Sequence, residues 1–246
     1  MARLVLPEAK VFKEIIGAVG KLADEVALRI TGEGVSLKAL DIDQSSYIEV
    51  LLPSDMFLEY NVSEEEIVGV STSNLKKVLK NLKKGENLIV ESSGDYVSFT
   101  VGAIARRVYR FRNLEVSLPE IPEFNLEFNA SAQLTSSSIK KILEDAESVS
   151  SVVEIDASSS DMLVFRAKGT GKVEVKLTLG SLALISLDVK KPSKSTYDIA
   201  KLSTVLGLTS ISDTVLLELS DKAPLKLEFK IGSGRVTYLL APIEEG

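Results

Sequence analysis

The chain has 246 residues and a formal net charge of −6, and it contains neither Cys nor His. The lack of Cys excludes disulfides, thiolate metal ligands and thiol nucleophiles, and the lack of His removes the commonest general base and transition-metal ligand. The negative charge predicts a surface that repels nucleic acid as a whole, so a nucleic-acid role requires basic residues gathered on one face. No apolar run approaches the roughly 20 residues that span a bilayer, and no signal peptide is recognisable, so we expect no membrane association.

Four helices are predicted, because an apolar residue recurs at i, i+3, i+4 and i+7 in four places. The first helix is expected from about Glu8 to Gly20, after Pro7, and the others follow serines that can cap them. The stripes are Phe12, Ile15, Ile16 and Val19; Leu75, Val78, Leu79 and Leu82; Ile139, Ile142, Leu143 and Ala146; and the weaker Leu202, Val205, Leu206 and Thr209. Their first members are spaced by about 63 residues, which predicts one structural unit written four times.

Alternating strands with intervening turns follow each predicted helix. In chain order they are Val26–Ile30, Val35–Leu40, Tyr47–Leu52, Asn87–Glu91, Tyr96–Val101, Arg107–Arg112, Val152–Ala157, Met162–Ala167, Lys172–Leu179, Val215–Leu219, Leu225–Lys230 and Arg235–Leu240. Further strands are expected at Arg3–Leu6, Glu66–Val70, Ala130–Leu134 and Leu184–Val189. One helix for several strands predicts the α+β class, with antiparallel sheets against which each helix packs its apolar stripe.

Residues 114–129, reading LEVSLPEIPEFNLEFN, are expected to be an extended connector, because two prolines exclude a helix or a central strand there. Its apolar Leu118, Ile121 and Phe124 indicate that it lies over a surface or receives a partner, since a solvated linker would be more polar. The predicted organisation is an N-terminal domain 1–113, the connector 114–129 and a similar C-terminal domain 130–246.

Lysines lie away from the apolar stripes on the predicted helices. They are Lys10 and Lys13, with Lys21 nearby; Lys76, Lys77, Lys80, Lys83 and Lys84; Lys140 and Lys141; and Lys201. On one helix such a face is most often simply solvated, but its recurrence favours a surface for a polyanion such as duplex DNA. Acidic residues are expected mostly on turns, the connector and the tail Glu244–Glu245. These helix faces carry no interleaved aromatic residues and no Arg-and-Asn pattern. We therefore expect contact with phosphates that does not depend on the base sequence.

No catalytic, cofactor or metal constellation is found, so we expect no enzyme activity and no cofactor. The pairs Asp41 with Asp43 and Asp156 with Asp161 are read as acids that hydrogen-bond to their own turns. The segment Gly232–Gly234 is too short for a phosphate loop and lacks a following helix, and the serines at 158–160 lack a partner base.

Several motifs resemble the proliferating cell nuclear antigen-type sliding clamps of archaea and eukaryotes, over essentially the full length. They are Gly34–Asp41 (GVSLKALD), Ser54–Tyr60 (SDMFLEY), Thr72–Leu82, Ala223–Phe229 (APLKLEF) and Tyr238–Glu245 (YLLAPIEE). The resemblance implies a ring of three identical or paralogous subunits, with helices lining the hole and sheets outside. The compact length and abrupt tail favour an archaeal source, with a cytoplasmic, nucleoid-associated location; a eukaryotic source would imply the nucleus.

The resemblance also implies a processivity factor that encircles double-stranded DNA, is loaded by an ATP-driven clamp loader, and tethers DNA polymerase, flap endonuclease and DNA ligase. The implied DNA-facing residues are Lys10, Lys13, Lys21, Lys76, Lys77, Lys80, Arg110, Lys140, Lys141 and Lys201. The implied partner-peptide pocket contains Leu40, Leu118, Ile121, Pro122, Pro224, Leu239, Leu240, Ala241 and Pro242. The implied subunit contact joins the edge strand residues Val108, Tyr109, Arg110, Phe111 and Arg112 to Lys172, Val173, Glu174, Val175, Lys176, Leu177 and Thr178.

The sequence leaves two other functions open. One is a checkpoint-type or regulatory ring subunit of the same fold, against which the full set of pocket residues argues. The other is a carboxylate-based hydrolase on a β-rich scaffold, which would need two acids converging in a cleft, and no spacing here supports that. The fourth helix departs from the clamp pattern, because Ser203 and Thr204 stand where the second helix has Lys76 and Lys77.

Overall fold

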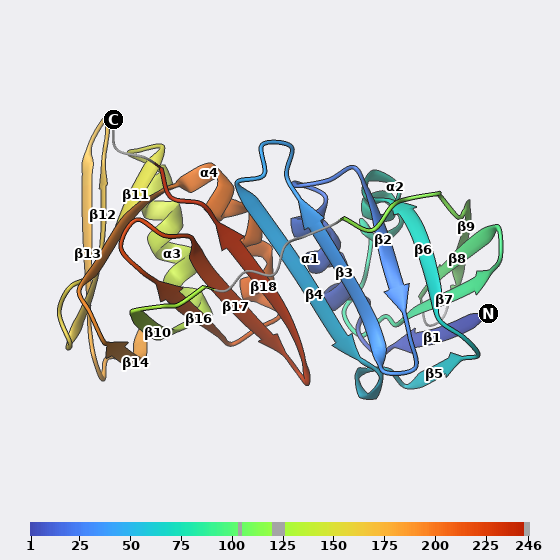
Figure 1. The fold of residues 1–246 in the computed structure, drawn as a ribbon. Coiled ribbons are helices and arrows are strands. Elements are labelled where there is room, and N and C mark those ends of the chain that lie inside the picture. The colour runs from blue at the N-terminus through green and yellow to red at the C-terminus, as the bar shows by residue number, and fades with distance from the viewer. Residues whose placement is uncertain (103–104, 120–125, 244–246) are drawn as a thin grey trace. The chain divides into compact units, whose positions relative to one another are not determined.

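The computed structural model describes residues 1–102, 105–119 and 126–243. The chain divides into two compact units. The first unit is Met1–Glu120 with Ile231–Val236, and the second is Ile121–Lys230 with Thr237–Gly246. Helices and antiparallel strands alternate in the same order in both halves of the sequence (Figure 1), so the predicted α+β class is confirmed.

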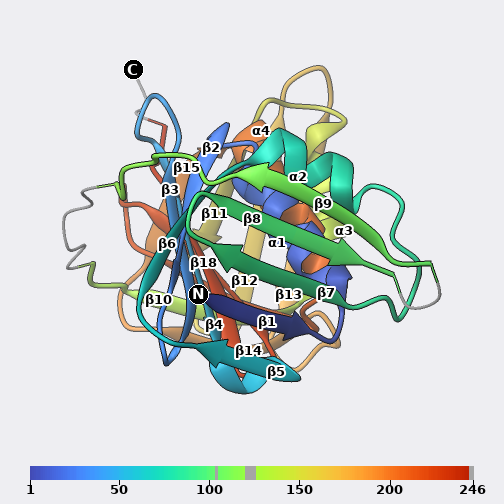
Figure 2. The same ribbon diagram turned by 90° about the vertical axis from the view of Figure 1, so that its right-hand side faces the viewer.

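The first half contains two helices and nine strands within the described residues. In order they are β1 (Ala2–Leu6), α1 (Ala9–Val19), β2 (Glu25–Ile30), β3 (Gly34–Leu40), β4 (Ser46–Pro53), the 3₁₀ turn η1 (Ser54–Met56), β5 (Glu59–Val62), β6 (Glu66–Ser71), α2 (Thr72–Leu79), β7 (Leu88–Ser93), β8 (Tyr96–Val101) and β9 (Arg107–Arg112). Strands β5-β1-β7-β8-β9 form one sheet, which faces the viewer in Figure 2, and β4-β3-β2-β6 are neighbours in another.

The second half repeats this order. Its elements are β10 (Ala130–Thr135), α3 (Ser136–Glu147), β11 (Val152–Ala157), β12 (Met162–Lys168), β13 (Lys172–Thr178), β14 (Leu184–Val189), β15 (Ser193–Asp198), α4 (Ile199–Leu202), the 3₁₀ helix η2 (Ser203–Ser210), β16 (Thr214–Leu219), β17 (Leu225–Ile231) and β18 (Gly234–Leu240). The strand orders β14-β10-β16-β17-β18 and β13-β12-β11-β15 match those of the first half, strand for strand. The duplication predicted from the spacing of the stripes is therefore visible in the topology.

Helix α1 forms where the first stripe was predicted and carries that stripe into the core. Phe12, Ile15, Ile16 and Val19 are buried, and the Phe12 ring stacks on Phe99 of β8 with centroids 6.4 Å apart. Each buried methylene contributes ~0.8 kcal/mol, so such a stripe is a substantial part of the core of the first unit. Burying it on one side of the helix leaves Lys10 exposed and Lys13 half-buried on the other.

Helix α2 begins as predicted and ends one turn earlier than predicted. The Ser71 hydroxyl caps it by accepting from the Asn74 N–H, but the helix stops at Leu79, so Leu82 does not lie on it. The polar groups beyond that point are satisfied elsewhere. Arg107 donates to the Asn81 carbonyl, and the Lys83 N–H donates to the Glu86 carboxylate at 2.9 Å. Three closely spaced lysines in one turn would also repel each other in a continuing helix.

The fourth helix is mostly a 3₁₀ helix, so the predicted stripe was wrong in its second half. Only Ile199–Leu202 is α-helical, and Ser203–Ser210 continues as η2. Because a 3₁₀ helix has three residues per turn, the buried apolar positions are Leu202, Val205 and Leu208, and Leu206 and Thr209 are only half-buried. The Thr209 hydroxyl donates to the Leu206 carbonyl at 2.6 Å, which stabilises the tighter turn.

Two strands were missed from the sequence. Strand β15 reads SKSTYD, and its buried face consists of Ser193, Ser195 and Tyr197, so it lacks the apolar alternation that marks a half-buried strand. Strand β5 has four residues at a sheet edge, which is too short for a periodic pattern. The other predicted strands are present, with ends that differ by at most two residues.

Candidate nucleic-acid interface and partner surfaces

The clearest basic surface lies on α1 and α2 of the first unit, which contact each other. Lys10 is exposed on α1, and Lys76 and Lys77 are exposed in the last turn of α2. Lysines there also interact favourably with the negative end of the helix dipole. We call Lys10, Lys13, Lys76 and Lys77 the α1–α2 lysines. They present cations from two neighbouring elements, which is what binding to a row of phosphates requires.

Lys76 has a structural contact as well. Its ammonium donates to the Gly20 carbonyl at the end of α1, at 2.7 Å, and the Thr72 hydroxyl is within 3.0 Å of the Ala23 and Asp24 carbonyls. These bonds hold the start of α2 against the end of α1, so the spacing of the α1–α2 lysines is fixed by backbone groups. Lys21 is exposed immediately beyond α1.

Lys80 caps the C-terminal end of α2, and Lys83 and Lys84 lie in the loop that follows it, where all three side chains are exposed. One acid lies among them: Glu86 is mostly buried, binds Arg107 at 3.1 Å and accepts from the Lys83 N–H. The loop therefore remains basic on its surface, with its carboxylate turned inwards.

The second unit carries a weaker basic surface than predicted. Lys140 and Lys141 are exposed on α3, but the same helix also exposes Glu144, Asp145 and Glu147. Lys140 lies 3.8 Å from Glu144 one turn later, in an (i, i+4) pair. The expectation that acids lie mostly off the helices was therefore wrong for α3. Asp198 caps the start of α4 by accepting from the Lys201 N–H, and the Lys201 side chain is half-buried. Thr204 lies on η2 and is buried.

Arg110 does not belong with the helix lysines. Residues directly opposite each other in an antiparallel pair share a face, and Arg110 pairs with Ser98, whereas Tyr109 pairs with Phe99. Because Phe99 faces α1, Arg110 projects from the other face of this sheet, where its guanidinium lies 4.2 Å from the centre of the Tyr96 ring. The structure thus places Arg110 on the outer face of a sheet edge.

A cleft of about 700 Å³ opens in the second unit beside residues 241–243. Residues 241–243 run along the free edge of β15, where the Ile243 N–H donates to the Thr196 carbonyl at 2.8 Å. On the other side, the Ser195 hydroxyl donates to the Ser220 carbonyl and accepts from the Lys222 N–H. The cleft is lined by Lys194, Ser195, Thr196, Asp221, Lys222, Ala241, Pro242 and Ile243.

Of the predicted pocket residues, Ala241 and Pro242 line this cleft, and half-buried Pro224 follows Ala223, whose carbonyl accepts from the Tyr197 hydroxyl. Burial raises the pKa of Tyr197 to about 12, so its hydroxyl stays protonated as a donor. Leu239 and Leu240 are buried, at 8% and 1% exposure, and Leu240 is a core residue.

The other predicted pocket residues divide into two groups. Leu40 ends β3 of the first unit and is half-buried, and Leu118 is 40% exposed. Ile121 and Pro122 lie outside the described residues, as do Phe124 and the tail acids Glu244 and Glu245. Sequence reasoning missed the polar wall of the cleft from β15 and the Asp221–Lys222 turn. The one indication of this wall in the sequence was Lys222, which lies beside an Ala-Pro turn.

Both strands of the predicted subunit contact end their sheets. Within the described residues, β9 pairs only with β8 (Figure 2), and β13 pairs only with β12 at the margin of the four-stranded sheet (Figure 1). Their side chains alternate as expected, with Val108, Arg110 and Arg112 exposed on β9. On β13 the exposed residues are Lys172, Glu174, Lys176 and Thr178. Such edges are open to pairing with another chain.

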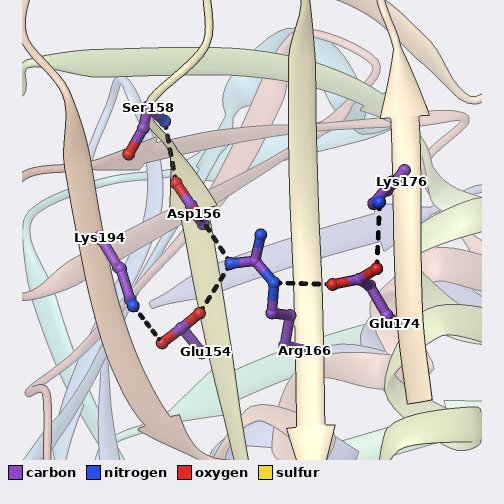
Figure 3. Close-up of polar contacts among 7 residues, drawn as sticks. All are labelled: Glu154, Asp156, Ser158, Arg166, Glu174, Lys176 and Lys194. Atoms are coloured by element: carbon purple, nitrogen blue, oxygen red, sulfur yellow. Dashed lines mark hydrogen bonds and ion pairs between the residues drawn. The ribbon is translucent and has the colours of Figure 1, made fainter.

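Arg166 of β12 organises the outer face of the four-stranded sheet (Figure 3). Its guanidinium binds Glu154 at 2.8 Å and Asp156 at 2.7 Å on β11, and Glu174 at 2.9 Å on β13. Lys194 and Lys176 bind the outer oxygens of Glu154 and Glu174, so three cations face three carboxylates. We call these six residues the Arg166 network.

The network lowers the pKa of two of its carboxylates, Glu174 and Asp156. Hydrogen bonds from Arg166 and then Lys176 lower the pKa of Glu174. For Asp156, burial alone would raise the pKa, but hydrogen bonds from Ser158 and Arg166 outweigh it, and the net pKa is lowered. The hydrogen bond that Arg166 donates to Asp156 is the largest cause of the raised pKa of Arg166. These carboxylates are therefore ionised and engaged at neutral pH.

The turn acids make local hydrogen bonds, as the sequence predicted. Asp41 accepts from the Ser46 N–H at 2.8 Å and from the Ser45 hydroxyl, and Asp156 accepts from the Ser158 N–H. Among the described residues, no three Asp or Glu side chains come together in a way that could hold a metal ion. In the same part of the chain, no helix is both long and apolar enough to cross a membrane.

Comparison with known proteins identifies the family. Residues 1–121 match the N-terminal domain of proliferating cell nuclear antigen, and residues 120–243 match its C-terminal domain. The DNA polymerase sliding clamp 1 of Aeropyrum pernix is 40% identical over 241 residues, which cover 96% of this chain and 97% of that protein. The DNA polymerase sliding clamp of Pyrococcus furiosus is 32% identical over 250 residues, 98% of each chain.

Solved structures show the same fold. The proliferating cell nuclear antigen (PCNA) of Thermococcus kodakaraensis superposes with a TM-score of 0.92 at 24% identity, covering 99% of this chain and all of that one. A chain of the PCNA2–PCNA3 complex from Sulfolobus tokodaii gives the same TM-score at 25% identity, with the same coverage.

A duplicated unit of two helices and nine strands, with lysines on its helices, defines a non-enzymatic binding protein of the DNA-clamp fold. The chain belongs to the proliferating cell nuclear antigen family, and it is a DNA polymerase sliding clamp. The predicted family, fold and function are thereby confirmed, as is the prediction that the chain is not an enzyme.

Proposed function

We propose that this chain is one of three subunits in a closed ring around duplex DNA, with domains 1–113 and 130–246 joined by the connector 114–129. The α1–α2 lysines carry the proposal: four cations on two contacting helices of an otherwise acidic protein. A ring of such units would place these cations around the duplex, where they contact phosphates without reading bases. The first domain supplies most of this contact, because α3 compensates its lysines with acids.

The ring would be opened by an ATP-driven clamp loader and would then tether DNA polymerase, flap endonuclease and DNA ligase. A short peptide of such a partner docks in the cleft beside β15, where Ala241, Pro242 and exposed Ile243 supply apolar contacts. Lys194, Asp221 and Lys222 form its polar wall, which suits a peptide that carries both apolar anchors and hydrogen-bonding side chains. Ile121 and Pro122 of the connector, which lie outside the described residues, are proposed as further contacts of this peptide from the resemblance alone. The archaeal relatives support a cytoplasmic, nucleoid-associated location.

The test is processivity on primed circular DNA with a loader and polymerase of a related archaeon. We expect the assembled clamp to lengthen the products of single binding events, because a tethered polymerase rebinds before it diffuses away. The matched variant Ala241→Asp with Pro242→Asp should assemble and load but lose the lengthening. Product lengths that are the same with and without the clamp, under conditions where loading is measured directly, would contradict the proposed function.

A further inference from the structure

A cleft of about 580 Å³ lies in the first unit, between β6 and the turn that joins β7 to β8. It is closed by residues 113–116, which follow the end of β9. We call it the first-unit cleft. The side chains that decide what it can bind are Ile67, Asp95, Tyr96, Arg112, Glu115 and Val116.

The first-unit cleft has the same place in the first repeat that the cleft beside β15 has in the second. Strand β6 corresponds to β15, the β7–β8 turn to the β16–β17 turn, and the segment after β9 to the segment after β18. The Leu114 N–H donates to the Gly69 carbonyl at 3.0 Å, just as the Ile243 N–H donates to the Thr196 carbonyl. Gly69 and Thr196 stand at the same position before the helix that follows their strand. The duplicated fold therefore forms this cleft twice.

Asn113 holds the first-unit cleft in shape. Its side-chain oxygen accepts from the Gly69 N–H at 2.8 Å, and its side-chain nitrogen is 3.4 Å from the Ile67 carbonyl and 3.3 Å from the Gly94 carbonyl, to which it donates. Its own N–H donates to the Asp95 carbonyl at 2.7 Å. One side chain thus joins β6, the β7–β8 turn and the segment after β9, so the cleft is preformed.

The apolar part of the first-unit cleft is accessible from outside. Ile67 of β6 is 45% exposed, and Val116 and the Tyr96 ring, both half-buried, line the same cleft. The guanidinium of Arg110 lies 4.2 Å from the centre of the Tyr96 ring and supports it from one face. An apolar side chain of a partner can bury itself against Ile67 and Val116, which is how a short peptide anchors in a pocket.

The charges of the first-unit cleft do not balance. Asp95, Glu115 and Arg112 are all exposed, and within the described residues neither carboxylate forms an ion pair. Two carboxylates are therefore available for a single guanidinium. Because complementary charge favours association, this excess selects a peptide that carries Lys or Arg.

The cleft beside β15 has a different balance of charge. Its Lys194 is bound by Glu154 at 2.7 Å, so Lys222 and Asp221 are the remaining charges of the lining, one of each sign. The two clefts share a backbone arrangement and differ in charge, so a change of charge in the peptide should affect them unequally.

We propose that the first-unit cleft is a second docking site, for a partner peptide that carries Lys or Arg beside its apolar anchor. The inference rests on the tethering function proposed above and deepens it, because one chain would hold two partner peptides at once. Pairing of β9 with a neighbouring subunit leaves the cleft accessible, since Arg112 at the end of that strand is the one β9 residue that lines it.

The experiment is isothermal titration calorimetry of the assembled clamp with two synthetic versions of one polymerase-tail peptide from a related archaeon. The versions carry either Lys or Glu beside the apolar anchor. We expect the Lys version to bind at two sites per chain and the Glu version at one. Added salt should weaken the additional event, because both of its carboxylates are exposed.

Three variants assign the additional event to the first-unit cleft. Ile67→Lys removes the apolar contact and adds a repelling cation, so the Lys version should then bind at one site per chain. The matched control Ile185→Lys changes an isoleucine of similar exposure, 47%, on β14 and should retain both sites. Asp95→Asn with Glu115→Gln should weaken the additional event by about tenfold, as expected for the loss of two exposed ion pairs. Circular dichroism confirms that each variant is folded.

A single site per chain for the Lys version would overturn the second docking site and leave the clamp function standing. An additional event that persists unchanged in folded Ile67→Lys would overturn it as well, because the peptide would then bind elsewhere. Failure of the tethering function itself is distinguishable, because it would appear as unlengthened products in the processivity assay and as no binding at the cleft beside β15.

Discussion

At the scale of single residues, position within an element decides how exposed a lysine is and whether an acid lies beside it. Lys77 is exposed on α2, with no acidic partner among the described residues, whereas Lys140 lies 3.8 Å from Glu144 on α3. The sequence places the two lysines at equivalent points of the repeat and so predicts equal roles. It could not show that an acid one turn later reaches Lys140, because that depends on the rotamers of two long side chains.

We predict that Lys77→Ala weakens DNA binding more than Lys140→Ala. Each lysine that contacts a phosphate contributes about 1 to the slope of log affinity against log salt. Lys77→Ala should reduce that slope by about this amount, and Lys140→Ala by clearly less, because Glu144 already neutralises part of its charge. Fluorescence anisotropy of a labelled duplex with the assembled clamp, over a salt series, measures both. Lys190→Ala is the matched surface control, and equal losses for Lys77 and Lys140 would contradict the assignment.

At the scale of elements, apolar periodicity predicted most of the strands and three of the helices, and tertiary contacts determined what it missed. The premature end of α2 depends on Arg107 and Glu86, which approach from β9 and from the loop before β7. Strand β15 is held by its pairing with β11 and by buried serines, a combination that no single-strand pattern reveals. Likewise, the cleft beside β15 depends on residues 241–243 lying against that strand.

The Arg166 network makes a prediction at this scale, because it joins three strands of one sheet. Arg166→Met should lower the free energy of unfolding at neutral pH, by about 1 kcal/mol for the pairs with Glu154 and Asp156, which are partly exposed. Urea unfolding measures the change. Arg29→Met, which breaks an exposed pair with Glu65, is the control and should change stability less.

The pH dependence of this stability has a definite sign. The pKa values of Asp156 and Glu174 are lowered in the folded chain, so the unfolded chain binds more protons in acid. The stabilisation is complete above the ordinary carboxyl pKa of about 4 and is lost as pH falls through the lower native values. Arg166→Met should flatten this acid limb. A variant as acid-sensitive as the wild type would show that Arg166 does not hold these carboxylates ionised.

At the scale of the whole molecule, the duplication was the part of the fold that the sequence predicted best. The spacing of about 63 residues between Phe12, Leu75, Ile139 and Leu202 corresponds to four helix-and-strand units in the structure. The Arg166 network could not be predicted in the same way, because the sequence does not show that Arg166 and Lys176 both bind Glu174 across neighbouring positions of the sheet.

The most direct test of the central claim is retention on DNA of different topology. The chain, assembled with whichever subunits complete its ring, is loaded on nicked circular duplex and then exposed to high salt before and after the circle is cut. We predict that salt leaves the clamp on the closed circle, because a ring is held by topology, and that linearisation releases it. Release from the intact circle by salt alone would show ordinary phosphate binding and would contradict encirclement.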